Sequence, residues 1–222
     1  MQLRRILFYA AVFTTVSFPR IVAAQDSSSS AAPKHSKKAA TPVESTLDSG
    51  SIANSIYRNK MLGFSCKIPA GWVLRTDEMN SSEEDGAEKA KSAQASGAKV
   101  LLAAFSRPPE ARAEDVNAAI LIAGEPAATY PGLNDAAQYF GPLTEVAKAQ
   151  GFAVDEEPYE IAVGTKTLVR GDFHKDVGSR VMHQSTLALL SHGYAISITI
   201  IAGTEDDVEE LIDGLTFSSS GK

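Results

Sequence analysis

The sequence predicts an α+β fold, an antiparallel β-sheet flanked by helices on both faces as an α/β/α sandwich, for residues 56–217. Three observations predict it. Runs 181–190 and 194–201 alternate along the chain with the period of two that is typical of strands. A helix pattern with an acidic first turn follows them directly. Further strand-like runs joined by short links surround a second helix pattern, and hairpin-length links produce antiparallel sheets.

The chain begins with the three parts of a secretory signal peptide. Arg4 and Arg5 precede a 13-residue apolar run, Ile6 to Phe18, and Val22-Ala23-Ala24 stands before Gln25. The run is too short for a bilayer, which needs about 20 apolar residues. We expect cleavage after Ala24 and a mature chain that is periplasmic or secreted. Twin-arginine export is the alternative that the paired arginines leave open.

Residues 25–55 are rich in Ser, Ala, Lys, Thr and Pro and contain almost no large apolar side chain. Such a segment cannot bury enough surface to become ordered, so we expect a flexible linker. A partner-binding tail is the alternative. The single folded domain is expected at 56–217, followed by a tail at 218–222.

The domain opens with two predicted strands, 56–59 and 62–68, and the second places Phe64, Cys66 and Ile68 on one face. Pro69 and Gly71 end this strand, because proline cannot donate to the ladder. Cys66 is the only cysteine, which excludes an internal disulfide. A buried, inert thiol is expected, and a reactive or intermolecular one is the alternative.

The polar stretch 76–97 has helical propensity after Glu83 but almost no apolar stripe. We expect a solvated helix or a mobile excursion, with an acidic cation site as the alternative. Strand patterns then return at 98–106 and 117–123.

A helix is predicted from Asn134, a good N-cap, to Gln150, with Gly151 in the stop position. Its apolar residues recur at helical spacing on one face: Ala136, Phe140, Leu143 and Ala147. Pro142 predicts a kink or a break near Gly141, because an interior proline costs about 3 kcal/mol.

Strand patterns follow at 152–156, 159–163 and 166–175, and then comes the hairpin. If His192 and Gly193 form its two-residue loop, Leu189 faces Ile196 and Leu187 faces Ile198 on one apolar face. Thr204 caps the next helix, whose first turn is acidic. Its apolar stripe would cover that face: Val208, Leu211, Ile212 and Leu215.

Charge argues against two classes of partner. Without residues 1–24 the chain keeps 18 basic and 27 acidic residues, a net charge of −9. Nucleic acid and anionic membrane surfaces are therefore not expected as partners, and nothing after the leader resembles a membrane span. Either an envelope protein or a small ligand remains possible, and the oligomeric state is open.

The domain's histidines suggest one candidate site. If the preceding turn is centred on Val177 and Gly178, Asp172 faces His183 directly and His174 lies one diagonal away on the same side. Two imidazoles and a carboxylate could bind zinc or another divalent ion. Histidines that are only hydrogen-bonded at the end of a sheet are the alternative, so no metal, cofactor or catalytic residue is assigned.

Other patterns of catalysis are absent from the sequence, including the nucleophile elbow, the glycine-rich phosphate loop and the paired-cysteine zinc spacing. The acidic run 155–157 is expected to be a solvated loop instead of an acid and base pair. Arg75 and Arg170 are placed to grip an anion, but each is expected to pair with a neighbouring carboxylate.

Both ends of the domain carry short motifs of turn and core residues. The opening contains Tyr57-Arg58-Asn59, Leu62-Gly63-Phe64, Ile68-Pro69 and Gly71-Trp72, and the close contains Gly193-Tyr194, the capped helix and Leu215-Thr216-Phe217. These motifs resemble the opening and closing patterns of the PsbP-like family. The resemblance covers about 56–217. It implies an antiparallel sheet between helices, in a superfamily that includes the extrinsic PsbP subunit of photosystem II and bacterial exported proteins. Most characterised members are non-enzymatic binding or assembly factors. It transfers no functional residue, because the matching positions are turn and core residues, and a shared fold is not a shared function.

Three functions follow as hypotheses. The first is an exported, non-catalytic binding or assembly module that binds a protein or a small ligand. The second is a metal-dependent or hydrolytic enzyme that uses Asp172, His174 and His183. The third is a structural envelope component whose acidic stretch, 76–97, contacts divalent ions or a basic partner.

Overall fold

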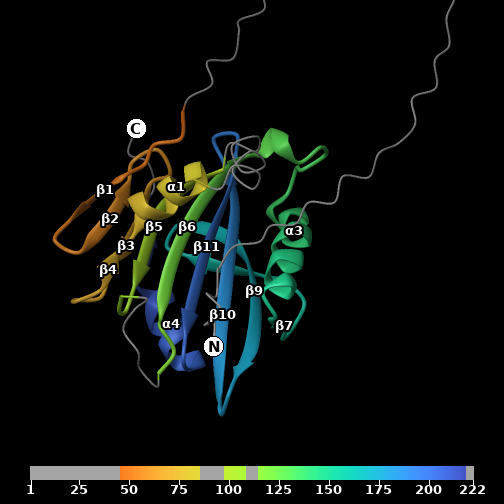
Figure 1. Cartoon of the computed structure of the whole chain (residues 1–222). Coiled ribbons are helices and arrows are strands. Elements are labelled where there is room, and N and C mark those ends of the chain that lie inside the picture. The colour runs from red at the N-terminus through yellow and green to blue at the C-terminus, as the bar shows by residue number, and fades with distance from the viewer. Residues whose placement is uncertain (1–45, 86–97, 109–114, 219–222) are drawn as a thin grey trace, which may run out of the picture. The chain divides into compact units, whose positions relative to one another are not determined.

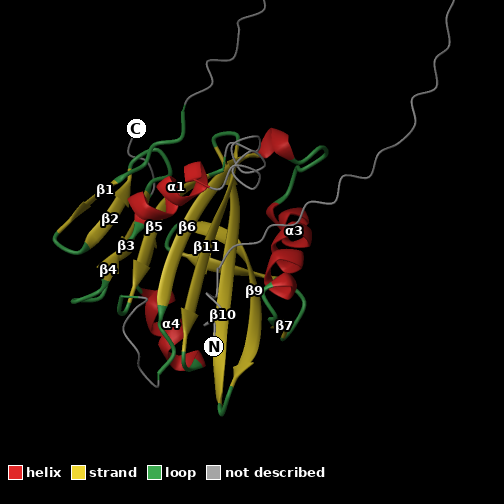
Figure 2. Cartoon of the chain, in the orientation of Figure 1, coloured by secondary structure: helices red, strands yellow, loops and turns green. Residues whose placement is uncertain are grey.

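Two antiparallel sheets and three α-helices make up the residues that the structure, a computed structural model, describes: 46–85, 98–108 and 115–218 (Figures 1 and 2). Helices and antiparallel strands are mixed along the chain, so the predicted α+β class is confirmed. The leader 1–24, most of the linker, the second half of the acidic stretch and residues 219–222 lie outside the described residues, and the expectations about them remain predictions.

The larger sheet has eight strands, with order β4-β5-β6-β11-β10-β9-β7 and with β8 also paired to β9. Its strands are β4 (Val73–Leu74), β5 (Lys99–Phe105), β6 (Ala119–Pro126), β7 (Ala153–Val154), β8 (Tyr159–Val163), β9 (Lys166–Val177), β10 (Arg180–Ser191) and β11 (Tyr194–Ala202). The two long hairpin strands therefore lie near the centre of the sheet, where both faces can be covered.

The smaller sheet has four strands in the order β1-β2-β3-β12. They are β1 (Ser51–Ala53), β2 (Ile56–Asn59), β3 (Phe64–Lys67) and β12 (Leu215–Phe217). The last strand of the domain pairs with β3 from its beginning, with Leu215 opposite Cys66 and Phe217 opposite Phe64. The small sheet thus joins the two ends of the domain.

The helices are α1 (Thr76–Asp85), α3 (Ala136–Ala149) and α4 (Glu205–Asp213), with a 3-10 turn η1 at Ala127–Thr129. On one face of the larger sheet, α4 and the small sheet enclose the main core, which contains Leu187, Ile196 and Ile198. On the other face, α3 packs over Ala188 and Ala195. Figure 1 shows α3 and α4 on different sides of the sheet.

The predicted sandwich therefore needs correction in one of its layers. Within the described part of the chain, the layer containing α4 is shared with a second β-sheet, so this face is not covered by helices alone. The physical reason is that β2, β3 and β12 bury apolar side chains, including Tyr57 and Phe217, on the same core as α4. These strands cover the part of the main core that a helix was expected to cover.

The C-terminal hairpin is confirmed in detail. Leu189 pairs with Ile196 and Leu187 with Ile198. His192 and Gly193 form the loop, with φ of 53° and 81°, which is the left-handed conformation that a primed turn requires. Thr204 caps α4 through its side-chain oxygen, which accepts from the backbone N–H of Asp207 at 3.1 Å. Val208 and Ile212 are buried beneath the sheet, as predicted.

The linker predicted at 25–55 is too long at its C-terminal end. Leu47 is 6% exposed and belongs to the main core, where it packs against Gly124 in β6. Ser51–Ala53 form β1, paired with β2 through a tight turn at Asn54 and Ser55, both with positive φ. The domain therefore begins near Leu47, because this one leucine fills a space that the sheet leaves above a glycine.

The helix predicted at 134–150 is present as α3, with two differences. Asp135, not Asn134, is the N-cap, and its carboxylate accepts from the N–H of Ala137 at 2.8 Å. Of the predicted kink or break near Gly141, the break is wrong, because the helix is continuous through Pro142, and the kink stays a prediction. Phe140 on one side of the proline and Ala147 on the other are both anchored in the same buried cluster, and this packing offsets the lost backbone bond.

The first part of the acidic stretch is an anchored helix and not an excursion. In α1, Thr76 accepts from the N–H of Ala103 at 2.9 Å. Asn80 bonds both backbone groups of Val100, donating at 3.0 Å and accepting at 3.1 Å. These side-chain bonds attach the helix along β5 without an apolar stripe, which explains why periodicity did not predict its start at Thr76.

Candidate functional site

A cleft of about 840 Å³ opens at one end of the larger sheet, where the start of β10, the ends of β5 and β6, the segment after β3 and the first two turns of α4 meet. We call it the sheet-end cleft. Its described lining residues are Pro69, Trp72, Ser106, Arg107, Asp115, Val116, Ala118, Arg180, Val181, His183, Gly203, Thr204, Asp207, Glu210 and Leu211. Trp72 and Leu211 belong to the margin of the main core, so the floor of the cleft is apolar and its rim is charged.

The basic residues of the rim are engaged within the protein. Arg107 donates to the backbone carbonyls of Asp115 and Val116, which holds the ends of β5 and β6 together. Arg180, from β10, lies 3.9 Å from the carboxylate of Asp115. The guanidinium groups therefore shape the opening of the cleft.

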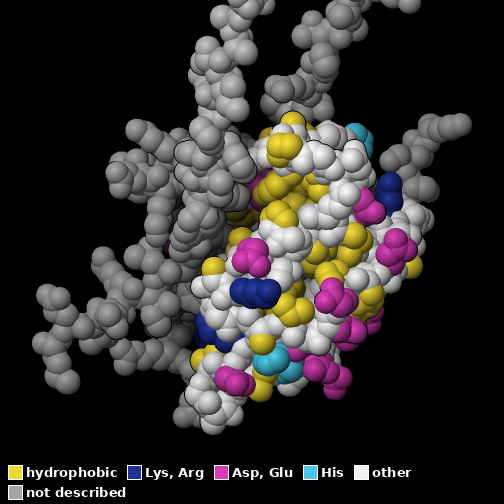
Figure 3. Space-filling model, turned by 90° about the vertical axis from the view of Figure 1, so that its right-hand side faces the viewer, with side chains coloured by type: hydrophobic (Ala, Val, Ile, Leu, Met, Phe, Trp, Pro, Cys, Tyr) yellow, Lys and Arg dark blue, Asp and Glu magenta, His cyan; other side chains and the backbone are white. Residues whose placement is uncertain are grey.

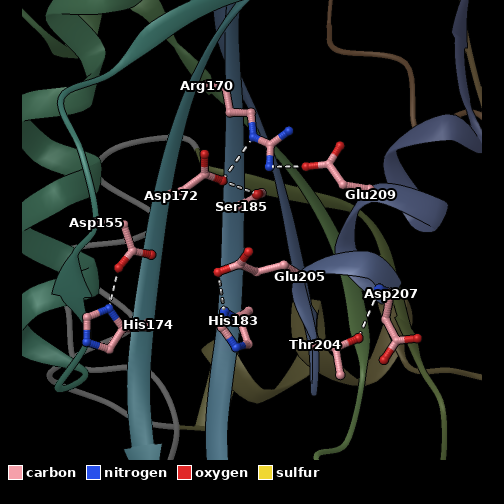
Figure 4. A network of polar contacts seen from close by, with 10 residues as sticks. All are labelled: Asp155, Arg170, Asp172, His174, His183, Ser185, Thr204, Glu205, Asp207 and Glu209. Carbon is pink, nitrogen blue, oxygen red and sulfur yellow. Dashed lines mark hydrogen bonds and ion pairs between the residues drawn. The ribbon is translucent and has the colours of Figure 1, made fainter.

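Beside the cleft, on the face of the sheet that α4 covers, Arg170 and Asp172 form the centre of a polar network (Figure 4). Arg170 Nε donates to Asp172 at 2.9 Å, and Arg170 also pairs with Glu209 of α4 at 2.5 Å. Asp172 accepts from the hydroxyl groups of Tyr159, at 2.8 Å, and Ser185. The Arg170 and Asp172 side chains are only 11% and 16% exposed, so each needs these partners to remain charged.

The network has a clear electrostatic effect. Burial disfavours charge on Arg170, but its bonds to Glu209 and Asp172 outweigh this and raise the pKa of the guanidinium. Partial burial, together with the hydrogen bond to Asp172, raises the pKa of Tyr159 to about 12. Arg170 therefore stays charged and Tyr159 stays neutral near neutral pH, and the predicted pairing of Arg170 with a carboxylate is confirmed.

The candidate histidines lie on the rung next to this network. His174 and His183 are directly opposite each other on β9 and β10, and Asp172 is opposite Ser185. The prediction placed Asp172 opposite His183, because it centred the turn on Val177 and Gly178. The loop is Gly178 and Ser179, and this shifts the pairing by two residues, which preserves the face but changes the partners.

The two imidazoles are directed to different partners (Figure 4). His174 Nδ1 bonds the carboxylate of Asp155, beyond β7, and His183 Nδ1 lies 3.7 Å from Glu205 at the start of α4. Within 46–85, 98–108 and 115–218, no three His, Cys, Asp or Glu side chains are grouped to hold a metal ion. The structure therefore places Asp172, His174 and His183 on one face but does not bring them together as ligands.

The bond to Asp155 raises the pKa of His174. A group whose pKa is raised in the folded state stabilises the fold below its unfolded pKa, about 6.5, and loses this contribution as the pH rises through the folded value. We therefore expect Asp155→Asn to lower the free energy of unfolding more at about pH 5.5 than at about pH 8.5, and NMR titration should show the His174 midpoint falling. Equal effects at the two pH values would contradict this assignment.

The other residues that the sequence singled out are buried or paired within the protein. Cys66 is fully buried, and burial raises the pKa of its thiol to about 12. Arg75 pairs with Glu78 in α1, with Nε and Oε2 2.7 Å apart, beside a smaller hollow of about 490 Å³ next to β1. Within the acidic run 155–157, Asp155 has a structural partner in His174.

On the side of the molecule that carries α3, Figure 3 shows acidic side chains with little basic surface among them.

The sequence did not predict the sheet-end cleft. Its walls come from five separate parts of the chain, and the side chains involved have no common spacing. The only local signal is the unequal length of the hairpin strands: β10 has 12 residues and β11 has nine. A difference in strand length predicts that one edge of the longer strand lacks a partner at its end. Whether a cleft forms there depends on the neighbouring elements, which the strand lengths do not place.

Comparison with known proteins identifies no family. No family model matches the chain, and no curated protein sequence does. No helix in the described ranges is long and apolar enough to cross a membrane.

Three solved structures are similar in part. LpqN of Mycobacterium tuberculosis, described as involved in cell envelope biogenesis, is 14% identical over 70% of this chain and 83% of its own, with a TM-score of 0.37. A Pseudomonas aeruginosa protein of unknown function is 17% identical over 46% and 68%, with a TM-score of 0.32. A Bacteroides thetaiotaomicron protein is 15% identical over 72% and 46%, with a TM-score of 0.37. At these values the similarities do not indicate what the chain binds.

Proposed function

We propose that this chain is an exported, non-catalytic binding module of the PsbP-like class, and that the sheet-end cleft is where it binds its partner or ligand. The observation that carries the proposal is the cleft itself, with an apolar floor around Trp72 and Leu211 and a charged rim. Concave sites with apolar linings and a few polar groups are the usual places for binding. The PsbP-like pattern at both ends of the domain supports the class.

A role without catalysis is supported by the way the polar groups beside the cleft are used. Arg170, Asp172 and Ser185 bond to one another and to α4, and the two histidines each face a carboxylate. A general base needs a free position directed at a substrate. In this network the polar atoms that could act as a base are bonded within the protein, where they stabilise the packing of α4 and β7 on the sheet.

Export is supported by the leader pattern before Gln25. In cells that make the full chain, the mature protein is expected outside the cytoplasm with Gln25 as its first residue. Fractionation followed by N-terminal sequencing tests this. An intact chain retained in the cytoplasm would contradict it.

Binding at the cleft is tested by position-specific photo-crosslinking in the same cells. A photoreactive phenylalanine at Val181, which is 37% exposed and lines the cleft, is expected to give a defined adduct. The matched control is Val154, which is 39% exposed on the edge strand β7. Adducts of equal yield at both positions, or none at Val181, would reject the cleft as the binding site.

A further inference from the structure

One strand of the larger sheet stops short at the sheet-end cleft. The ladder between β10 and β11 ends with the pair His183–Ala202, and the chain then turns at Gly203 toward α4. On its other edge β10 continues, paired with β9, as far as Arg180. Among the described residues, no strand therefore lies beside Val181 on the side that β11 has left.

The other neighbour of β11 also continues past its end. The ladder between β11 and β6 ends at Ile201–Ala119, but Ala118 is still bonded to the end of β5 through Ser106, whose N–H donates to the Ala118 carbonyl at 2.8 Å. Neighbouring strands lie about 4.8 Å apart, so the position between the extensions of β10 and β6, beside Val181 and Asn117, has the width of one strand. Gly203 closes its inner end, since a Cβ there would lie 3.7 Å from Val116. We call this position the slot.

Backbone groups on both sides point into the slot. A hairpin with a two-residue loop is closed by a hydrogen-bonded pair, here Val177 and Arg180, and successive residues direct their N–H and C=O groups to opposite edges. Val181 therefore directs its N–H and C=O away from β9 and toward the slot. By the same alternation, since Ala118 bonds β5, Asn117 directs its backbone groups toward the slot from the opposite side.

The surroundings of the slot indicate the chemistry of an occupant. Trp72 and Leu211 provide apolar surface in the same cleft, and the rim cations Arg107 and Arg180 are engaged with the 115–116 segment. Asp207 and Glu210 also line the cleft, and neither carboxylate has an ion-pair partner among the described residues. These two carboxylates therefore give the cleft a negative charge that a basic side chain of the occupant can complement.

We propose that the slot accepts an extended segment of another polypeptide, which continues the sheet in the place of β11. The side chains of the segment that face α4 meet Trp72, Leu211 and the two carboxylates on the same face of the sheet, so long basic side chains with apolar stems suit these positions, and the alternate side chains face away. Its main chain bonds to Val181 and Asn117, so binding depends on strand geometry and requires little sequence identity beyond a basic residue at alternate positions. The proposal rests on the proposed function and specifies its partner.

The test uses the capped peptide Lys-Val-Lys-Val-Lys-Val and the full mature chain. Trp72 is the only tryptophan, so its fluorescence reports binding at the cleft directly. Saturable change is expected with this peptide, with much weaker binding of Glu-Val-Glu-Val-Glu-Val and of a version with proline at its centre. Equal binding of all three peptides, or no change up to millimolar concentration, would overturn the proposal.

A matched pair of variants isolates the backbone contact. Val181→Pro removes the N–H that points into the slot but none that pairs with β9, and should weaken binding about tenfold, while Val181→Thr keeps the N–H and should bind nearly as the parent. If the proline variant does not fold, hydrogen exchange on the parent decides: the Val181 amide should become protected with peptide, and an unchanged exchange rate would overturn the proposal.

The outcomes separate this inference from the proposed function. A crosslinked cellular adduct at Val181 without peptide-induced protection would reject the strand mode and retain the cleft as a binding site. A dimer of the free protein that Val181→Pro abolishes would identify a second copy as the occupant and overturn the proposal of a different partner.

Discussion

Replacing Phe140 by alanine is expected to lower the free energy of unfolding by about 3–5 kcal/mol. Phe140 is 3% exposed and lies between α3 and β9, in the smaller of the two buried clusters. Phe140 is one of four buried aromatic side chains in this cluster, with Tyr139, Phe152 and Phe173, so its removal leaves a cavity among tightly packed neighbours. Urea unfolding measures the change, and Lys148→Ala, on the exposed side of the same helix, should stay within about 0.5 kcal/mol.

The close contact between the Phe140 ring and Gly171 gives this prediction a second test. A Cβ at Gly171 would lie 2.5 Å from Cε1 of Phe140, so Gly171→Ala should cost about 1–3 kcal/mol by overpacking. In the Phe140→Ala background the same change has space, and its cost should largely disappear. Strictly additive effects would show that the two residues do not share this space.

Replacing Leu47 by alanine is expected to cost about 2–5 kcal/mol, although the residue lies in a stretch with the composition of a linker. Leu47 is 6% exposed and fills the space above Gly124 in the main core. Thermal or urea unfolding of the mature chain measures the loss. Ile52→Ala is the matched control, because Ile52 is 41% exposed in the neighbouring β1, and its effect should be small.

An unchanged stability in Leu47→Ala would mean that the domain begins at Ile56, as its composition suggests. Gly124→Ala extends the test, since its Cβ would collide with the Leu47 side chain. It should destabilise the parent more than it destabilises the Leu47→Ala variant.

The elements that sequence reasoning found best are those in which local chemistry and periodicity agree. The hairpin at His192 and Gly193 combines long alternating runs with a loop residue that accepts positive φ, and its register was correct. The helix after Thr204 combines a cap, an acidic first turn and an apolar stripe. Each signal alone is weak, but together they leave few alternatives.

The errors arose where two local solutions were nearly equal. Two-residue loops at Val177–Gly178 and at Gly178–Ser179 both use the same glycine, and only the second occurs. The choice determines whether Asp172 faces His183 or Ser185. Asn134 and Asp135 are likewise both good caps, and the structure uses Asp135.

Other features depend on contacts between distant parts of the chain. Leu47 is ordered because of a glycine in β6, and α3 continues through Pro142 because both halves pack on the sheet. The slot exists because β11 ends at Ala202 while its neighbours continue. Periodicity describes one segment at a time, and so the candidate site could not be found from it.

The pairing of β12 with β3 sets the order in which the domain can form. Leu215–Phe217 complete the small sheet and place Phe217 against Phe64, with ring centroids 4.7 Å apart. Because β3 is translated long before β12, a nascent chain cannot close its main core until both strands have been synthesised. Under the export proposed above, this delay would leave the polypeptide unfolded enough to pass through a narrow channel.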